Sequence, residues 1–182
     1  MKTTDARVRY TRRAIKESFL ALLREKPVNR ITVKEVCERA ELNRATFYTH
    51  YGNCFILLDS IEQELLDSFK QSLSLIGSFD VSALICAIYA MIQQHEDACR
   101  VLIFDGKSAT VLDRMIAMGR ESSLAHWRQL FPLTSEKDLE MLYTYLSNGL
   151  VHVIVEGYGK YDREDVVRFV DRIVNSSLAP YR

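Results

Sequence analysis

Two short helical patterns separated by a tight break constrain the fold of this chain more than any other feature. The first pattern follows Thr32, which can cap a helix, and Glu35 three residues later can complete a capping box. Four residues at helical spacing give this helix one apolar face: Val33, Val36, Cys37 and Ala40. The break is Glu41-Leu42-Asn43, in which Leu42 can fill the core and Asn43 can cap the next helix.

The second pattern divides its side chains between two faces of a short helix. Phe47 and Tyr51 lie four residues apart and are expected to face inward. The outward face carries groups suited to a DNA groove, namely Arg44, Thr46, Tyr48, Thr49 and His50. Two helices joined in this way predict a helix-turn-helix, whose second helix enters the major groove. The alternative is that Tyr48 and His50 are ordinary surface residues.

This stretch resembles the DNA-binding domain of the TetR/AcrR family of bacterial transcription regulators. The matching pieces are Ile31-Thr32-Val33, Ala40, Thr46-Phe47-Tyr48-x-His50-Tyr51 and Leu57-Leu58, within residues 9–60. The resemblance implies an all-α homodimer of about nine helices, in which a three-helix helix-turn-helix domain precedes a helical bundle. We place the DNA-binding domain at residues 1–52 and the effector-binding and dimerisation domain at residues 53–182. The latter is loosely similar to regulators grouped with dihydroxyacetone-kinase activators.

The resemblance also implies which side chains contact DNA. Base edges are the expected targets of Lys34, Arg44, Ala45 and Thr46, and Arg44 could read guanine through two hydrogen bonds. Phosphates are the expected targets of Tyr48, Thr49 and His50. Thr32 can offer a phosphate its hydroxyl and a helix N-terminus, and Asn43, which caps the recognition helix, is also an expected DNA contact. The sequence departs from the family at one position: the family's lysine at the start of the following helix is Cys54 here. One phosphate contact is therefore expected to be missing, with Asn53 or a backbone amide as the alternative donor.

The charges of the chain are unevenly distributed. Residues 1–51 contain twelve Lys and Arg against six Asp and Glu, so the rest of this neutral chain carries a net charge of −6. A basic head on an acidic body suits a protein whose head alone meets phosphates, although chance segregation would give the same division. A helix is expected from near Thr11 to Glu25. Around and ahead of its start lies a basic arm, which is expected either to contact phosphate or to stay solvated: Lys2, Arg7, Arg9, Arg12 and Arg13.

Apolar stripes predict further helices along the body. A long helix from Asn53 to about Ile76 carries the stripe Leu58, Ile61, Leu65, Phe69, Leu73 and Ile76, and Gly77-Ser78 ends it. The acidic residues Glu62, Glu64 and Asp67 are expected on its solvated face. Five more helices are expected over residues 80–94, 96–104, 108–130, 135–158 and 162–178, with Asp80 and Asp162 as caps.

The last two helices resemble the family's dimerisation element. Their expected seam includes Leu146, Leu150, Val153, Phe169, Val170 and Ile173, unless these stripes form the core of a single chain. A small-molecule effector of unknown identity is expected in the body. Its wall candidates are Tyr89, Phe104, Met115, Met118, Trp127 and Tyr145, although residues at helical spacing can also be plain core.

Composition and motifs limit the remaining functions. Hydrophobic content of 48% and charged content of 26% are typical of a globular protein. The sequence lacks a membrane-spanning segment and a signal peptide, so we expect a cytoplasmic protein. It also lacks a phosphate loop, a nucleophile elbow and zinc-ligand spacing around Cys37, Cys54, Cys86 and Cys99. We therefore expect neither enzyme activity, metal nor cofactor.

These observations lead to two functional predictions. The first is a repressor that binds palindromic double-stranded DNA as a homodimer and is released by its effector. The alternative is an interaction protein or co-regulator of the same fold, with weakened DNA binding, that acts through a partner protein. The missing lysine at Cys54 keeps the alternative open.

Overall fold

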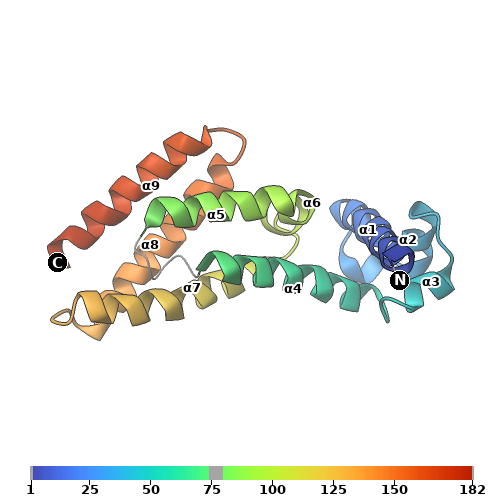
Figure 1. The fold of residues 1–182 in the computed structure, drawn as a ribbon, viewed down its shortest axis with the longest axis horizontal. Helices are drawn as coiled ribbons and strands as arrows, with labels where there is room; N and C mark the ends of the chain where they lie inside the picture. The colour runs from blue at the N-terminus through green and yellow to red at the C-terminus, as the bar shows by residue number, and fades with distance from the viewer. Residues whose placement is uncertain (1, 74–79, 182) are drawn as a thin grey trace. The chain divides into compact units, whose positions relative to one another are not determined.

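The regular elements of the chain are helical throughout the part that the structure describes. The computed structural model describes residues 2–73 and 80–181. Figure 1 shows α1 (Lys2–Glu25), the 3₁₀ turn η1 (Val28–Arg30), α2 (Val33–Arg39), α3 (Arg44–Tyr48), α4 (Cys54–Leu73), α5 (Val81–Gln94), α6 (Glu96–Cys99), the π-helical turn η3 (Arg100–Phe104), α7 (Ala109–Leu130), α8 (Glu136–Gly157), α9 (Arg163–Leu178) and the 3₁₀ turn η4 (Ala179–Tyr181). The predicted all-α class is confirmed. Ile76 and the Gly77-Ser78 break lie outside the described residues.

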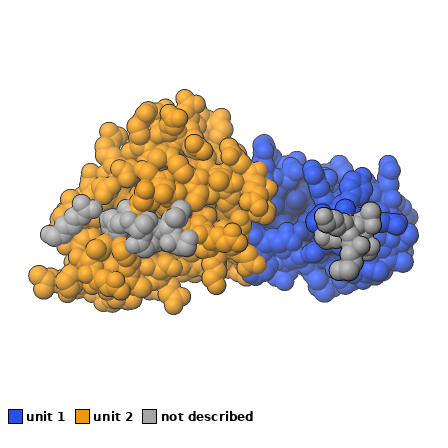
Figure 2. All heavy atoms as spheres, in the orientation of Figure 1, with its two compact units in different colours: residues 1–65, 96–109 blue, residues 66–95, 110–182 orange. Residues whose placement is uncertain are grey.

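The chain divides into two compact units, which Figure 2 colours separately. The first unit comprises residues 1–65 and 96–109, and the second comprises residues 66–95 and 110–182. The first unit therefore contains the predicted helix-turn-helix together with α6 and η3. The functional boundary between residues 52 and 53 stays a prediction, because compactness does not report which residues bind DNA.

Helix α1 starts earlier than the sequence predicted. It begins at Lys2, so Arg7 and Arg9 lie on a helix and not on an irregular arm. The first turns escaped prediction because their apolar residues, Val8 and Tyr10, are exposed and show no stripe. No glycine or proline interrupts this segment, so nothing in it opposes a helix. The predicted end before Pro27 is confirmed, since α1 stops at Glu25.

The core of the first unit gathers side chains from α1 to α4 and from α6 and η3, where Cys99, Val101 and Leu102 are fully buried. The predicted stripe of α1 is buried, and α2, α3 and α4 add further apolar side chains, so that the core contains Ile15, Phe19, Leu22, Leu23, Val36, Cys37, Phe47, Cys54, Leu57, Ile61 and Leu65. Each helix contributes one face, as expected for short amphipathic helices that cannot be stable alone.

One acidic residue of α4 does not lie on a solvated face, contrary to the prediction. Glu62 is only 8% exposed and accepts a 2.7 Å hydrogen bond from the buried Ser108 hydroxyl. Glu64 is half-buried and pairs with Lys16 of α1. Asp67 is exposed as predicted. The error arose because Ser108 lies 46 residues away in sequence, and helical periodicity within α4 cannot reveal such a partner.

The second unit packs α5 against α9 and α8 against α9. Two arginine–glutamate pairs, Arg120 with Glu140 and Arg128 with Glu136, join α7 to α8. Asp80 caps α5 by accepting a 2.8 Å hydrogen bond from the Ala83 amide. The predicted cap at Asp162 is only half right: it occupies the position before α9, but its side chain makes no capping hydrogen bond.

A close approach between α7 and α8 gives a stability prediction. A Cβ at Gly119 would lie 2.9 Å from the Tyr143 hydroxyl, which donates a 2.6 Å hydrogen bond to the Ile116 carbonyl. In Gly119→Ala, displacing this buried hydroxyl should cost about 1–3 kcal/mol. That cost outweighs a gain in helix propensity of about 1 kcal/mol. Urea unfolding should therefore show net destabilisation.

The matched test of this clash is the same substitution in a Tyr143→Phe background. The hydroxyl is then absent, and Gly119→Ala should become stabilising by up to about 1 kcal/mol. The same sign of effect in both backgrounds would contradict the assignment of Gly119 to this contact.

Two further absences hold for residues 2–73 and 80–181. Every helix there is too short or too polar to cross a membrane. The same residues contain no group of three or more His, Cys, Asp or Glu side chains placed to hold a metal ion.

Candidate nucleic-acid interface

Helix α2 starts with the predicted capping box. The Thr32 hydroxyl accepts a hydrogen bond from the Glu35 amide at 3.3 Å, and the Glu35 carboxylate accepts one from the Thr32 amide at 2.9 Å. Lys26 of the preceding turn also donates to Glu35, at 2.5 Å. These donors lower the pKa of Glu35 to about 2, with Lys26 as the largest cause. The start of α2 is thus fixed by local hydrogen bonds.

The lowered pKa of Glu35 predicts a loss of stability in acid. Because the folded protein favours the carboxylate, its contribution is fully present above the ordinary pKa of 4.5 and disappears as the pH falls towards about 2. Urea unfolding of the wild type and Glu35→Gln should therefore differ at pH 6 and converge only as the pH falls to about 2. The control is Glu41→Gln, which removes an exposed carboxylate beside the same helix. A difference that is independent of pH would contradict this role.

The turn between α2 and α3 contains a residue that the sequence did not mark. Glu41 has a φ of 55°, in the left-handed region where glycine is usual. The Leu42 amide then donates a 2.9 Å hydrogen bond to the Cys37 carbonyl, which closes the end of α2. Leu42 is half-buried. The absence of glycine concealed this turn geometry, although the position of the break was predicted correctly.

Helix α3 has the predicted inner and outer faces. Asn43 caps it by accepting a 2.7 Å hydrogen bond from the Thr46 amide. Phe47 is fully buried, Tyr51 is 4% exposed, and their ring centroids lie 5.9 Å apart. The outward residues Arg44, Ala45, Tyr48 and Thr49 are exposed, whereas Thr46 and His50 are half-buried. The division of faces is confirmed, and the DNA-binding roles stay predictions.

Three threonine hydroxyls at this surface already donate within the protein. Thr32 donates to the Glu35 carboxylate at 2.8 Å, Thr46 to the Asn43 side chain at 2.9 Å, and Thr49 to the Thr46 carbonyl at 2.7 Å. A hydroxyl has a single proton to donate. Thr32 must therefore release Glu35 before its hydroxyl can donate to a phosphate.

Much of the positive charge of the first unit is also paired internally. Lys34 lies 3.6 Å from Glu38, Arg39 lies 3.0 Å from Glu25, Arg24 lies 3.8 Å from Asp105, Lys26 pairs with Glu35 and Lys16 pairs with Glu64. Arg44, in contrast, is exposed at the first position of α3 and pairs with no carboxylate of the described residues. Among the predicted base-reading residues, Arg44 is therefore free to bind an external acceptor.

The start of α4 carries no basic side chain. Cys54 is the first residue of the helix and is only 5% exposed, and burial raises the pKa of its thiol. The Asn53 side chain accepts hydrogen bonds from the Phe55 and Ile56 amides, both at 2.9 Å. Phe55 and Ile56 are 57% and 51% exposed. This turn thus presents apolar side chains where the family resemblance implies a lysine.

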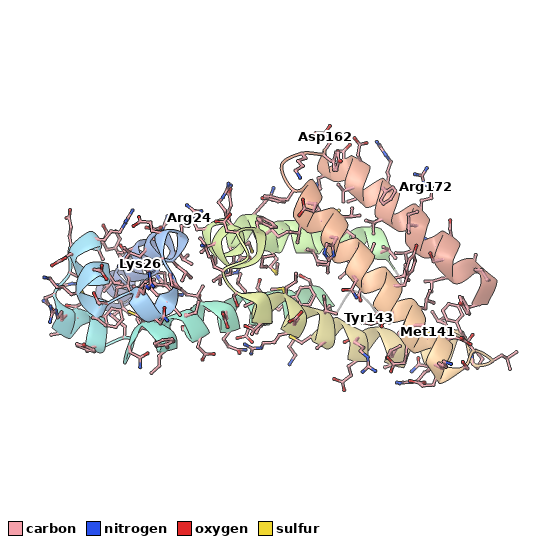
Figure 3. All side chains as sticks on the ribbon, turned by 180° about the vertical axis from the view of Figure 1, so that it is seen from behind. Arg24, Lys26, Met141, Tyr143, Asp162 and Arg172 are labelled. Carbon is pink, nitrogen blue, oxygen red and sulfur yellow. The ribbon has the colours of Figure 1, made fainter. Side chains whose placement is uncertain are left out.

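The predicted dimer residues differ in burial within the single chain. Leu146 and Val170 are buried, whereas Leu150, Val153 and Ile173 are half-buried and Phe169 is 42% exposed. A Cβ at Gly149 would meet nothing within 4 Å, so part of the α8 backbone is uncovered. Met141 and Tyr145 of α8 and Arg172 of α9 are also exposed, and Figure 3 labels Met141 and Arg172. A seam would therefore rest on Phe169 and the half-buried residues, with Leu146 and Val170 supporting it.

The predicted ligand-wall residues do not share one environment. Tyr89, Met115 and Trp127 are buried in the second unit and Met118 is half-buried there. Tyr145 is 69% exposed, and Phe104 belongs to the first unit. Helical spacing selected these residues but could not show which of them face the same interior.

Comparison with known proteins agrees with this architecture. No family model matches the chain. Over 59 residues, it is 29% identical to the uncharacterized HTH-type transcriptional regulator YxbF of Bacillus subtilis (strain 168), a match that takes in 32% of this chain but only 16% of that protein.

Solved structures are similar over nearly the whole chain. The dihydroxyacetone kinase operon activator DhaS matches with a TM-score of 0.57 and 14% identity, over 94% of this chain and 96% of that one. A TetR-family transcriptional regulator from Streptomyces coelicolor matches with a TM-score of 0.53 and 13% identity, over 93% and 83% of the two chains. The chain therefore has the fold of TetR-family regulators, and the predicted resemblance is confirmed at that level.

Proposed function

We propose that the chain is a TetR-type transcriptional regulator that binds a palindromic operator as a homodimer. Occupancy of the operator represses transcription, and a small-molecule effector bound in the second unit releases the DNA. The observation that carries the proposal is Arg44, which is exposed and has no carboxylate partner among the described residues, at the start of a capped helix whose inner face is buried. A guanidinium in that position suits bidentate recognition of a guanine edge.

The remaining surface supports phosphate contacts around this reader. Tyr48 and Thr49 are exposed on the same helix, and His50 follows half-buried. Lys34 is the second basic candidate, but it must leave Glu38 to reach DNA. An exposed ion pair of this kind is worth little, so a phosphate can displace the carboxylate at small cost. The proposed interface thus has one strong base contact, from Arg44, surrounded by weaker phosphate contacts.

The proposal is tested by gel shifts with the DNA that lies upstream of the chain's own coding sequence. Arg44→Ala should weaken binding by about 1–3 kcal/mol and relax the preference at one position of the operator. Tyr48→Phe is the control, because loss of a phosphate contact should weaken binding similarly on all sequences. If Arg44→Ala lost the same affinity for every DNA sequence, Arg44 would not be a base-reading residue.

The second candidate function is a co-regulator that acts through a partner protein, with weak DNA binding of its own. The neutral start of α4 favours it, because Cys54 is buried and its neighbours Phe55 and Ile56 are exposed and apolar. The same gel shifts decide between the candidates. A wild-type chain that binds the upstream DNA no more tightly than unrelated DNA supports the co-regulator.

A further inference from the structure

A buried hydroxyl in the second unit has no hydrogen-bond partner among the residues that the structure describes. Tyr89 of α5 is 4% exposed, and its hydroxyl makes no hydrogen bond to any of the described residues. Native proteins pair nearly all buried polar groups, so each exception calls for a physical explanation. A bound ligand that accepts a hydrogen bond from the Tyr89 hydroxyl would be such an explanation.

The surroundings of this hydroxyl are aromatic and partly cationic. The ring of Tyr158, next to the C-terminal end of α8, has its centroid 5.9 Å from that of Tyr89, with an angle of 38° between the ring planes. Burial raises the pKa of Tyr89, with Tyr158 as a smaller cause, and the charge of Arg163 partly offsets the rise. Arg163 is the first residue of α9 and follows Asp162, which Figure 3 labels. Tyr89 thus faces the corner between α8 and α9.

We propose that Tyr89 is the donor of an effector site for small molecules that combine a flat apolar body with a carbonyl-type oxygen. A phenol has one proton to donate, so the ligand must bring an acceptor. The tilted ring pair of Tyr89 and Tyr158 favours a flat body, because aromatic surfaces pack well against planar groups. Neutral carbonyls and carboxylates share this acceptor chemistry. The inference rests on the proposed function, since it gives the effector a chemical class.

The helix that carries Tyr89 is partly exposed over its first two turns. Along residues 81–88, every side chain except Ile85 is half-buried and keeps part of its surface in solvent. Ile85 and Ile92 are buried at helical spacing from Tyr89 and provide apolar surface on the same side of α5. A ligand with an apolar body that reaches the hydroxyl would meet these apolar side chains beside it.

Bound ligand would act on the first unit through chain connectivity. Helix α5 ends at Gln94, and α6, which belongs to the first unit, begins at Glu96. A single residue, His95, separates them. A ligand that shifts α5 thus acts on a segment of the unit that carries α3, which is the coupling that release of DNA requires.

The experiment compares benzoate, benzamide and toluene as probes of the whole chain in thermal unfolding. The three share one ring but carry a carboxylate, a neutral carbonyl and no acceptor. Benzoate, benzamide or both should raise Tm by about 3 °C at tenfold excess over the dissociation constant, and toluene should not. A response to benzoate alone assigns the site to carboxylates, and a response to benzamide assigns it to neutral carbonyls as well.

Two Tyr→Phe variants make the test specific. Tyr89→Phe should abolish the response to the probes, whereas Tyr10→Phe, at an exposed tyrosine of the first unit, should keep it in full. Without a probe, Tyr89→Phe should melt at the same temperature as the wild type or higher, since it removes an unpaired polar group. Four results would each overturn the proposal. The first is a Tm of Tyr89→Phe below that of the wild type without a probe, and the second is an equal response of the two proteins to the probes. The third is a toluene response equal to that of benzoate, and the fourth is no response of the wild type to any probe.

Operator binding separates this inference from the proposed function. In gel shifts without a probe, Tyr89→Phe should bind the upstream DNA as tightly as the wild type. If the wild type fails to bind that DNA while the probes raise its Tm, the proposed function fails and the ligand site stands. If DNA binding is intact and the probes have no effect, only the ligand site fails.

Discussion

A Phe169→Asp variant is expected to sediment as a monomer and to lose operator binding, while its helical content stays unchanged. Phe169 is 42% exposed in the single chain, so aspartate there should not disturb the fold of one protomer. Inside a seam between two chains, the same carboxylate would be buried without a partner, at a cost of about 3–5 kcal/mol. Both copies carry the change, because a two-fold interface uses the same surface twice.

The expected loss of DNA binding follows from the short length of α3, the proposed recognition helix. Helix α3 has five residues, so one copy reaches few base pairs. In a dimer, two linked copies of α3 would contact two half-sites that lie about 34–36 Å apart, or a larger whole number of DNA helical turns apart. Linkage makes the dimer bind more tightly than either copy alone. The expected result is a loss of operator binding that parallels the loss of dimer.

The control for this experiment is Leu133→Asp. Leu133 is fully exposed after α7, outside the proposed seam, so its replacement should leave both dimerisation and DNA binding intact. Sedimentation velocity at micromolar concentration measures dimerisation, and gel shifts measure DNA binding. A dimeric Phe169→Asp variant, or a monomeric wild type, would show that these helices are not a seam.

Phe47→Ala is expected to unfold the first unit. Phe47 is fully buried on the inner face of α3, where it packs against Tyr51. Truncating a buried phenylalanine costs about 3–5 kcal/mol, because the lost contacts leave a cavity. Tyr48→Ala is the matched control: it removes the adjacent aromatic ring, which is 57% exposed, and should change stability by no more than about 0.5 kcal/mol.

The two variants also separate folding from DNA contact. Urea unfolding followed by circular dichroism, with proteolysis of the first unit as a second readout, should detect the loss in Phe47→Ala. Tyr48→Ala should keep the fold but weaken binding to all DNA sequences. Comparable stability of the two variants would contradict the inward placement of Phe47.

Local patterns allowed most of the helix-turn-helix to be predicted from the sequence. The capping box at Thr32 and the cap at Asn43 depend on residues three positions apart, and both form as expected. The inner face of α3 also follows from local spacing. Glu41 could not be predicted, because a left-handed residue without glycine has no local signature.

Contacts between distant segments were beyond the reach of such patterns. Glu62 looked solvated because its partner Ser108 comes from another part of the chain. The stripe of α9 predicted apolar burial at both Val170 and Phe169, yet only Val170 is buried within one chain. Periodicity predicts which face of a helix is apolar. Whether that face packs against its own chain or against a second copy depends on tertiary packing.

The division of the first unit between two stretches of sequence has a consequence for its synthesis. Residues 96–109 cover part of this unit, where Ser108 meets the buried Glu62 and Asp105 approaches Arg24. A ribosome makes the recognition helix long before it makes this stretch. The first unit of the nascent chain therefore stays incomplete until residue 109 has left the exit tunnel, because the Glu62 carboxylate lacks its Ser108 partner until then. A fragment cut after residue 65 would remain in the same unfinished state.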